Sequence, residues 1–228
     1  MQPISPAGCA GIPGTTLPTG TNCRMVAIGA STGGTRAIET VMRSMPQNSP
    51  GIVIVQHMPE TFTGAFAERL NTNCPMEIRE ARDWDDIKQG TALVAPGDSH
   101  LVVAKNGNRL QVRLKKGPRV HFQRPSVDVL FYSVASNVGR NAVGVILTGM
   151  GSDGAKGLLA MHSEGAHAIA QDERSCAIFG MPREAIALGA VDEVLPLKQI
   201  AGSIISRMSS ARNRRREWSP VAASKDSV

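Results

Sequence analysis

The chemistry that this chain could perform rests on one serine, one histidine and one aspartate: Ser31, His57 and Asp153. Each follows a short, continuously apolar run rich in valine and isoleucine, a composition that predicts a buried parallel strand. These runs are Met25–Ile28, Ile52–Val55 and Ala142–Leu147. Since the carboxyl ends of parallel strands form the ligand-binding edge of an open α/β sheet, we expect the three side chains to converge there as nucleophile, base and orienting carboxylate.

Ser31 occupies the centre of a Gly-Ala-Ser-Thr-Gly string between a predicted strand and a predicted helix. This G-x-S-x-G pattern is typical of a sharp turn that raises a nucleophilic hydroxyl above the sheet, next to a helix N-terminus that favours negative charge. A phosphate-binding turn is the alternative. Position 31 is not glycine and no Gly-Lys-Ser/Thr string occurs, so both nucleotide-binding fingerprints are absent.

His57 and Asp153 each have a simpler interpretation when considered alone. A lone histidine at the end of an apolar strand is commonly a structural residue, and Asp153 could cap the helix that follows it. The predicted topology favours the catalytic interpretation, because three unrelated structural residues would have to end on the same sheet edge. The order Ser, His, Asp also differs from the Ser, Asp, His order of α/β-hydrolases and indicates another hydrolase family.

The remaining pattern alternates strands and helices. Apolar residues at helical spacing follow Ser31, His57, Ser126 and Asp153, and Leu101–Ala104 and Leu110–Leu114 predict a hairpin across Asn106-Gly107. The predicted fold is α/β: a three-layer, doubly wound, mainly parallel sheet with one antiparallel hairpin. The hairpin region, residues 105–124, has seven basic residues and no acidic one, which we interpret as a solvated face, with a docking surface as the alternative.

Composition limits the classes of function. Residues 1–23, rich in proline and glycine and almost without charge, predict a flexible segment, residues 24–208 a single catalytic domain, and residues 209–228 a basic disordered tail. Residues 207–228 carry +4 of the net charge of +6, and aromatic residues are only 4% of the chain, so nucleic-acid binding is not predicted.

The cysteines and the hydropathy pattern predict a location for the protein. Four cysteines without metal-ligand spacing predict neither a metal site nor a disulfide framework. No apolar run is long enough for membrane insertion or a signal peptide. We therefore expect a cytoplasmic protein.

Six strings, in order, resemble the catalytic domain of CheB-type chemotaxis protein-glutamate methylesterases. The resemblance runs from about Arg24 to Met208, and the strings are Val26–Gly34, Val55–Pro59, Val94–Gly97, Arg124–Asp128, Leu147–Gly154 and Phe179–Arg183. It implies a similar three-layer fold and a triad at Ser31, His57 and Asp153. The implied reaction is hydrolysis of glutamate methyl esters on methyl-accepting chemoreceptors, together with deamidation of glutamines.

Backbone amides complete the expected site: Thr32, at the start of a helix, and Met150, by the family resemblance, are candidate oxyanion donors. The Met150 side chain could equally be a wall of the pocket. No metal or organic cofactor is required by this chemistry. A non-catalytic receptor-binding adaptor and a general small-ester hydrolase are the alternative functions.

Family members typically carry a receiver domain before the catalytic domain, whereas residues 1–23 hold no Asp or Glu that could accept a phosphoryl group. We therefore expect a constitutively open site. The sequence alone does not fix the oligomeric state.

Overall fold

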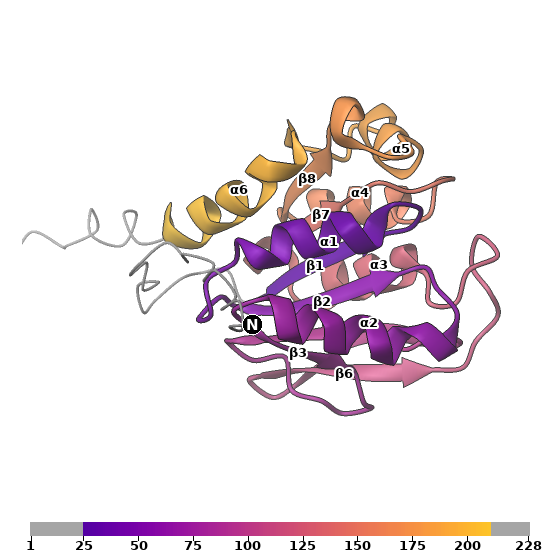
Figure 1. The fold of residues 1–228 in the computed structure, drawn as a ribbon, viewed down its shortest axis with the longest axis vertical. Helices are drawn as coiled ribbons and strands as arrows, with labels where there is room; N and C mark the ends of the chain where they lie inside the picture. Colours follow the sequence, from indigo (N-terminus) through magenta and orange to yellow (C-terminus); the bar gives the residue numbers. More distant parts are fainter. Residues whose placement is uncertain (1–24, 211–228) are drawn as a thin grey trace, which may run out of the picture.

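The structure is a computed structural model that describes residues 25–210. In that range one seven-stranded sheet, parallel throughout, has the strand order β3-β4-β2-β1-β7-β8-β9, and β5 and β6 form a separate antiparallel pair (Figure 1). The strands are β1 (Met25–Ala30), β2 (Gly51–Gln56), β3 (Glu77–Glu80), β4 (Thr91–Val94), β5 (His100–Asn106), β6 (Arg109–Lys115), β7 (Ala142–Ile146), β8 (His167–Gln171) and β9 (Glu193–Leu195).

Helices cover both faces of the sheet, as a doubly wound fold requires. They are α1 (Gly34–Arg43), α2 (Glu60–Asn73), α3 (Val127–Asn137), α4 (Ala155–Ser163), α5 (Met181–Ala187) and α6 (Leu197–Ser210), with 3₁₀ turns at Gly139–Asn141 and Glu173–Ser175. One face carries α1, α2 and α6, and the other carries α3, α4 and α5 together with the hairpin. The predicted three-layer architecture is confirmed.

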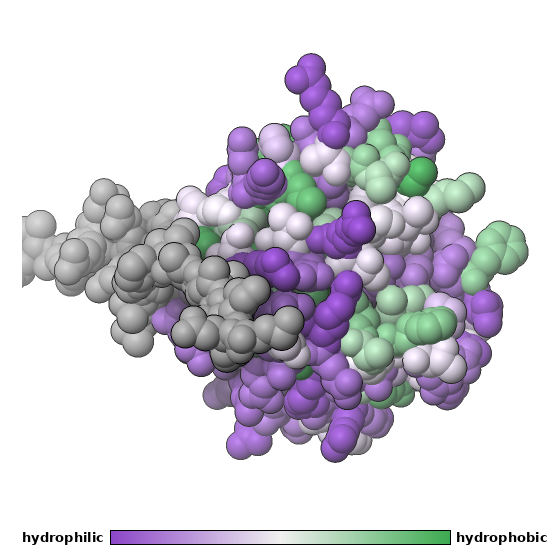
Figure 2. All heavy atoms as spheres, viewed as in Figure 1, coloured by the Kyte–Doolittle hydropathy of each residue, from purple (hydrophilic) through white to green (hydrophobic). Residues whose placement is uncertain are grey.

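Alternate residues of the central strands supply the two cores. In β1, Val26 and Ile28 pack with α1, α2 and α6, whereas Met25 and Ala27 pack with α3 and α4. Because both faces are covered, all six residues of β1 are buried, which explains why this strand appears as a continuous apolar run. On the face seen in Figure 2 most exposed residues are hydrophilic, and apolar residues gather at the edge where α1 and α2 begin.

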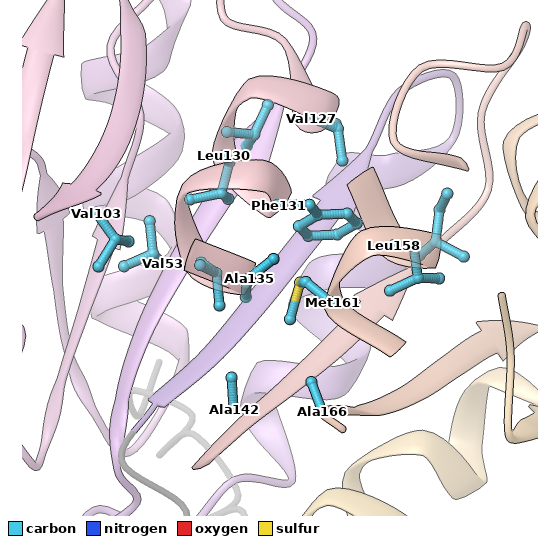
Figure 3. Packing of buried hydrophobic residues seen from close by; sticks show 14 of the residues in the cluster. Val53, Val103, Val127, Leu130, Phe131, Ala135, Ala142, Leu158, Met161 and Ala166 are labelled. Carbon is cyan, nitrogen blue, oxygen red and sulfur yellow. The ribbon is translucent and has the colours of Figure 1, made fainter. Parts of the chain in front are cut away.

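The core between α3 and α4 is tightly packed around Phe131, whose side chain is fully buried and points toward Leu158 and Met161 of α4 (Figure 3). Gly157 allows this approach. A Cβ atom on Gly157 would lie 2.7 Å from the Cβ of Phe131 and 2.9 Å from the carbonyl oxygen of Asp128. The absence of a side chain at one position of α4 therefore sets the distance between the two helices.

The chain reverses its direction of travel across the sheet at β1. It moves from β1 to β2 on one side and returns later to β7 on the other side. The carboxyl ends of β1 and β7 thus flank a topological switch point, where open α/β sheets bind their ligands. Ser31 follows β1 and the Gly149–Gly154 turn follows β7.

Two strands were not predicted: β3 and β9. Both are short edge strands, and β3 has the charged sequence Glu-Ile-Arg-Glu, so neither shows an apolar run. The predicted strand at 166–170 lies at His167–Gln171, and the hairpin is confirmed with exposed basic residues at Lys105, Arg109 and Lys115. The predictions for residues 1–23 and 211–228 lie outside the described residues, whereas residues 209 and 210, which were expected to belong to the tail, form the end of α6.

Replacing Gly157 by alanine tests the packing of α3 on α4. Alanine favours a helix over glycine by about 1 kcal/mol, but here we expect a net loss of about 1–3 kcal/mol in the free energy of unfolding, because the new methyl group meets the backbone of Asp128 and the Cβ of the buried Phe131. The matched control is Gly202→Ala in α6, where a Cβ would meet nothing within 4 Å. We expect that variant to gain up to about 1 kcal/mol. Urea denaturation measures both, and a stabilised Gly157→Ala variant would contradict the packing.

Candidate active site

Ser31 lies in the predicted sharp turn between β1 and α1. Its amide donates to the carbonyl of Thr148 at 3.0 Å, and Gly33 has a φ of 80°, a left-handed conformation that glycine adopts at little cost. A Cβ on Gly33 would also lie 2.5 Å from the Cβ of Ala177. The turn therefore needs glycine for both its conformation and its packing, and it ends directly at the N-terminus of α1.

His57 is placed beside Ser31 by the register of the sheet. Ala30 of β1 is the register partner of Gln56 of β2, so the residues that follow them, Ser31 and His57, are neighbours at the carboxyl edge. The amide of His57 donates to the carbonyl of Ala30 at 3.1 Å. The expected proximity of these two residues thus follows from parallel strand pairing.

Asp153 reaches His57 across the switch point. Its Oδ2 atom lies 2.7 Å from Nε2 of His57, and the two side chains are 2% and 6% exposed. A neutral imidazole that donates from Nε2 to this carboxylate keeps Nδ1 as an acceptor. The structure therefore brings together a carboxylate and an imidazole in the arrangement that a general base requires, next to the turn that holds Ser31.

The Asp153 carboxylate is held by the N-terminus of α3. Oδ1 accepts from the hydroxyl of Ser126 at 2.8 Å and from the amide of Asp128 at 3.0 Å, and Oδ2 accepts from the amide of Val127 at 2.8 Å. A helix N-terminus offers unpaired N–H groups and partial positive charge to an anion. The N-cap of α4 is Gly154, without a side-chain bond, so the interpretation of Asp153 as the cap of the following helix is wrong.

This setting decides the ionisation of Asp153. Burial raises the pKa of its carboxyl group, but the hydrogen bonds from His57, from the amides of Asp128 and Val127 and from Ser126 outweigh burial and leave the pKa below its ordinary value. Asp153 is therefore an anion at neutral pH. A fixed anion at this place orients the imidazole and would stabilise its protonated form.

A second buried carboxyl group, Asp128, lies beside Asp153 and was not predicted as part of the site. Burial raises its pKa and the charge of Asp153 raises it further, against bonds from the amide of Gly157 at 2.7 Å and from His121 at 3.0 Å. Ligand atoms of His121, Asp128 and Asp153 lie within 4.8 Å of one another, yet each is engaged by protein groups. The prediction that the site needs no metal or cofactor stays a prediction.

Sequence reasoning also missed the residues that fix the serine turn. Nε2 of Gln56 donates to the carbonyl oxygens of Ser31 at 2.8 Å and His57 at 3.1 Å, while its buried Oε1 has no partner in the described part of the chain. The hydroxyl of Thr148 donates to the carbonyl of Thr32 at 2.9 Å. Gln56 directly precedes His57, and Thr148 lies in the same short string as Asp153. This closeness in sequence to the predicted site residues is the feature that could have identified them.

The candidate oxyanion donors flank Ser31. The amide of Thr32 precedes the first turn of α1, whose N–H groups lack partners within the helix. Met150 follows Gly149, and a Cβ built on Gly149 would lie only 2.8 Å from the Cβ of Ser31. The Met150 side chain is 76% exposed, so it stands on the rim of the site.

Comparison with known proteins agrees with this geometry. The family model described as CheB methylesterase matches residues 26–204, a range that contains Ser31, His57 and Asp153. The chain belongs to the CheB methylesterase family. The resemblance found in the sequence is thereby confirmed.

Individual members of the CheB family show how much of each protein is shared. A protein-glutamate methylesterase/protein-glutamine glutaminase of Syntrophus aciditrophicus is 55% identical over 185 residues, which cover 81% of this chain and 54% of that protein. A protein of the same name from Yersinia pestis is 55% identical over 189 residues, 83% of this chain and 54% of its own length. The chain thus spans about half the length of these curated relatives.

A solved structure supports the fold. The CheB methylesterase catalytic domain of Thermotoga maritima is 37% identical to this chain, covers 80% of it and 97% of its own length, and superposes with a TM-score of 0.79. The part of the chain that the two proteins share corresponds to almost the whole of that catalytic domain.

The pKa shifts predict opposite effects of two neighbouring carboxyl groups on stability. Asp153 has a lowered pKa, so its charge stabilises the fold above the unfolded value of about 3.9, and this contribution is lost as the pH falls through the lower folded value. We expect Asp153→Asn to lower the free energy of unfolding at pH 7 by about 1–3 kcal/mol, and by less at pH 3.

Asp128→Asn is the matched control for this measurement. Because the pKa of Asp128 is raised, the wild type gains stability relative to that variant as the pH falls. Denaturant titrations between pH 3 and pH 7 measure both differences. The same pH slope for the two variants would contradict the assignment of opposite shifts.

Proposed function

We propose that this chain is a serine hydrolase that removes methyl groups from glutamate methyl esters on chemoreceptors. The observation that carries the proposal is the contact of 2.7 Å between His57 Nε2 and the buried Asp153 carboxylate, beside Ser31 at the switch point. The names of relatives at 55% identity supply the substrate, because they are called protein-glutamate methylesterase/protein-glutamine glutaminase.

In the proposed reaction, Ser31 Oγ attacks the carbonyl carbon of the ester while Nδ1 of His57 takes its proton. The Asp153 anion stabilises the imidazolium that forms. The imidazolium then gives this proton to the departing methoxide, so methanol leaves and a glutamyl ester of Ser31 remains. Water repeats the sequence, with His57 again as base, and releases glutamate and the free serine.

The negative charge of the tetrahedral intermediate needs preorganised donors. We assign this role to the backbone amides of Thr32 and Met150, which lie on either side of Ser31. The N-terminus of α1 adds partial positive charge at the same place. These groups require no rearrangement of the turn, because Gln56 and Thr148 already hold its carbonyl groups.

The same site would deamidate glutamine. A glutamine side chain differs from the methyl ester only in its leaving group, so attack by Ser31 expels ammonia in place of methanol and gives the same glutamyl-enzyme. Both substrates end as glutamate. One acyl-enzyme therefore accounts for the double name of the relatives.

The proposed partners are methyl-accepting chemoreceptors, and the proposed location is the cytoplasm. Among the described residues, none of the helices combines the length and the apolar character that a membrane span needs. We infer that the chain acts on parts of its receptor that are accessible from the aqueous side.

Methanol release from methylated receptor membranes tests the function. We expect Ser31→Ala to abolish release while the free energy of unfolding changes by less than about 1 kcal/mol, because a hydroxyl in a surface turn contributes little to packing. His57→Gln should also abolish release, because the hydroxyl is a poor nucleophile without a base. For Asp153→Asn we expect a loss of roughly 10³- to 10⁴-fold in kcat with KM nearly unchanged.

Each alternative function has its own outcome in this assay. A Ser31→Ala variant that keeps a tenth of the wild-type rate would remove Ser31 as the nucleophile. A wild type that binds the membranes without releasing methanol would indicate a receptor-binding adaptor. Hydrolysis of small esters alone would indicate a general esterase.

A further inference from the structure

The segment before α3 contains a tight hairpin with an unusual choice of residues. Val120 and Gln123 exchange two backbone hydrogen bonds, of 3.0 and 2.9 Å, around His121 and Phe122. These two residues have φ values of 49° and 62°. Two successive left-handed residues between paired strands form the type I′ turn, for which Asn-Gly is the preferred sequence.

Phe122 is a poor residue for its conformation and for its exposure. A Cβ atom makes the left-handed region unfavourable, most of all for a bulky side chain. The Phe122 side chain is 89% exposed, so no packing within the protein compensates for the strain. A strained backbone conformation at a residue that gains no packing from it points to a role of Phe122 in function.

This hairpin is fixed to the active site. Nε2 of His121 lies 3.0 Å from Oδ2 of Asp128, whose amide donates to Asp153 at 3.0 Å, and Asp153 in turn holds His57. The base of the hairpin is held as well, since Arg124 pairs with Asp98 and the Asp98 amide donates to the carbonyl of Arg124 at 3.0 Å. Two hydrogen bonds therefore connect the residue before Phe122 to Asp153.

Other exposed apolar side chains surround the same edge of the sheet. Phe62, in the first turn of α2, is 59% exposed, and Met150 is 76% exposed. Ile178, whose carbonyl accepts a hydrogen bond from the amide of Gly149, is 42% exposed. Figure 2 shows apolar residues gathered where α1 and α2 begin. Two basic groups near the turn, Lys116 and Arg124, both pair with Asp98, and Arg119 lies 3.5 Å from the carbonyl oxygen of Phe122.

We propose that Phe122 is a substrate-binding residue: its ring packs against apolar side chains of the polypeptide that presents the glutamyl ester to Ser31. A polypeptide whose glutamyl ester reaches Ser31 would extend across this edge of the sheet, where the turn at residues 120–123 and the exposed apolar residues Phe62, Met150 and Ile178 lie. A small ester bound at Ser31 would gain nothing from a side chain that stands in solvent. Phe122 thus selects esters carried on a protein, and this inference rests on the proposed function.

The decisive variant is Phe122→Gly. Glycine suits the left-handed position, so the thermal midpoint should stay at or above that of the wild type. We expect kcat/KM for methanol release from methylated receptor membranes to fall by about tenfold, mainly through KM, since an exposed aromatic that becomes buried on binding is a typical hot spot. Phe122→Leu, which keeps an apolar side chain, should retain most of the activity.

A small substrate separates binding of the polypeptide from chemistry. N-acetyl glutamic acid γ-methyl ester α-methylamide carries the same reacting group without a protein, and its kcat/KM should change by less than about twofold in Phe122→Gly, as no contact to the triad is removed. The matched control is Trp84→Gly. Trp84 is also an exposed aromatic residue with a left-handed φ, of 70°. It differs in that it follows β3, the outermost strand, which is three strands away from β1, and in that it stacks on Arg113. We expect no change in the ratio of the two efficiencies there.

Three results would overturn the proposal. In the first, Phe122→Gly demethylates the receptor as efficiently as the wild type. In the second, both substrates lose activity equally, which would mean that the hairpin only supports the geometry of the triad. In the third, Trp84→Gly reproduces the loss. A wild type that cleaves the small ester and releases no methanol from receptors would instead contradict the proposed function, and would do so before any variant is compared.

Discussion

The carboxylate of Asp153 at the N-terminus of α3 is the contact on which the site depends. Four donors converge on it: Ser126, the amides of Val127 and Asp128, and His57. Three of them belong to one helix start, so α3 orients the carboxylate and the carboxylate orients the imidazole. A helix that is distant in sequence from both Ser31 and His57 thereby determines the direction in which the base points.

In the proposed mechanism, this arrangement makes one side chain serve stability and catalysis together. An anion at a helix N-terminus stabilises the fold, and the same anion favours imidazolium beside the nucleophile. The cost appears at Asp128, where burial next to Asp153 raises the pKa. His121 and the amide of Gly157 offset part of that cost. Their hydrogen bonds to Asp128 connect the turn at residues 120–123 and α4 to the start of α3, where Asp153 is held.

The sequence was sufficient for the parts of the site that follow from local pattern. Apolar runs located β1, β2 and β7, and parallel pairing then placed Ser31 beside His57. It predicted His57 as a partner of Asp153 but not the donors at the start of α3, since Ser126 lies 27 residues away and the local pattern favours a cap on the next helix instead. The edge strands β3 and β9 were not predicted for a different reason. Their side chains are mostly not buried, so their sequences contain no apolar run.

Glycines of two separate strings explain why α3 can approach the triad at all. A Cβ on Gly29 would lie 2.1 Å from Cγ1 of Val127, and one on Gly154 would lie 2.5 Å from the same atom. Neither position has room for a side chain beside this valine, and Gly154 also has a φ of 93°, which favours glycine. That valine also donates its amide to Asp153. The glycines near Ser31 and Asp153 are therefore explained by the packing of α3 against both turns. A side chain at either position would keep the N-terminus of α3 from reaching the Asp153 carboxylate.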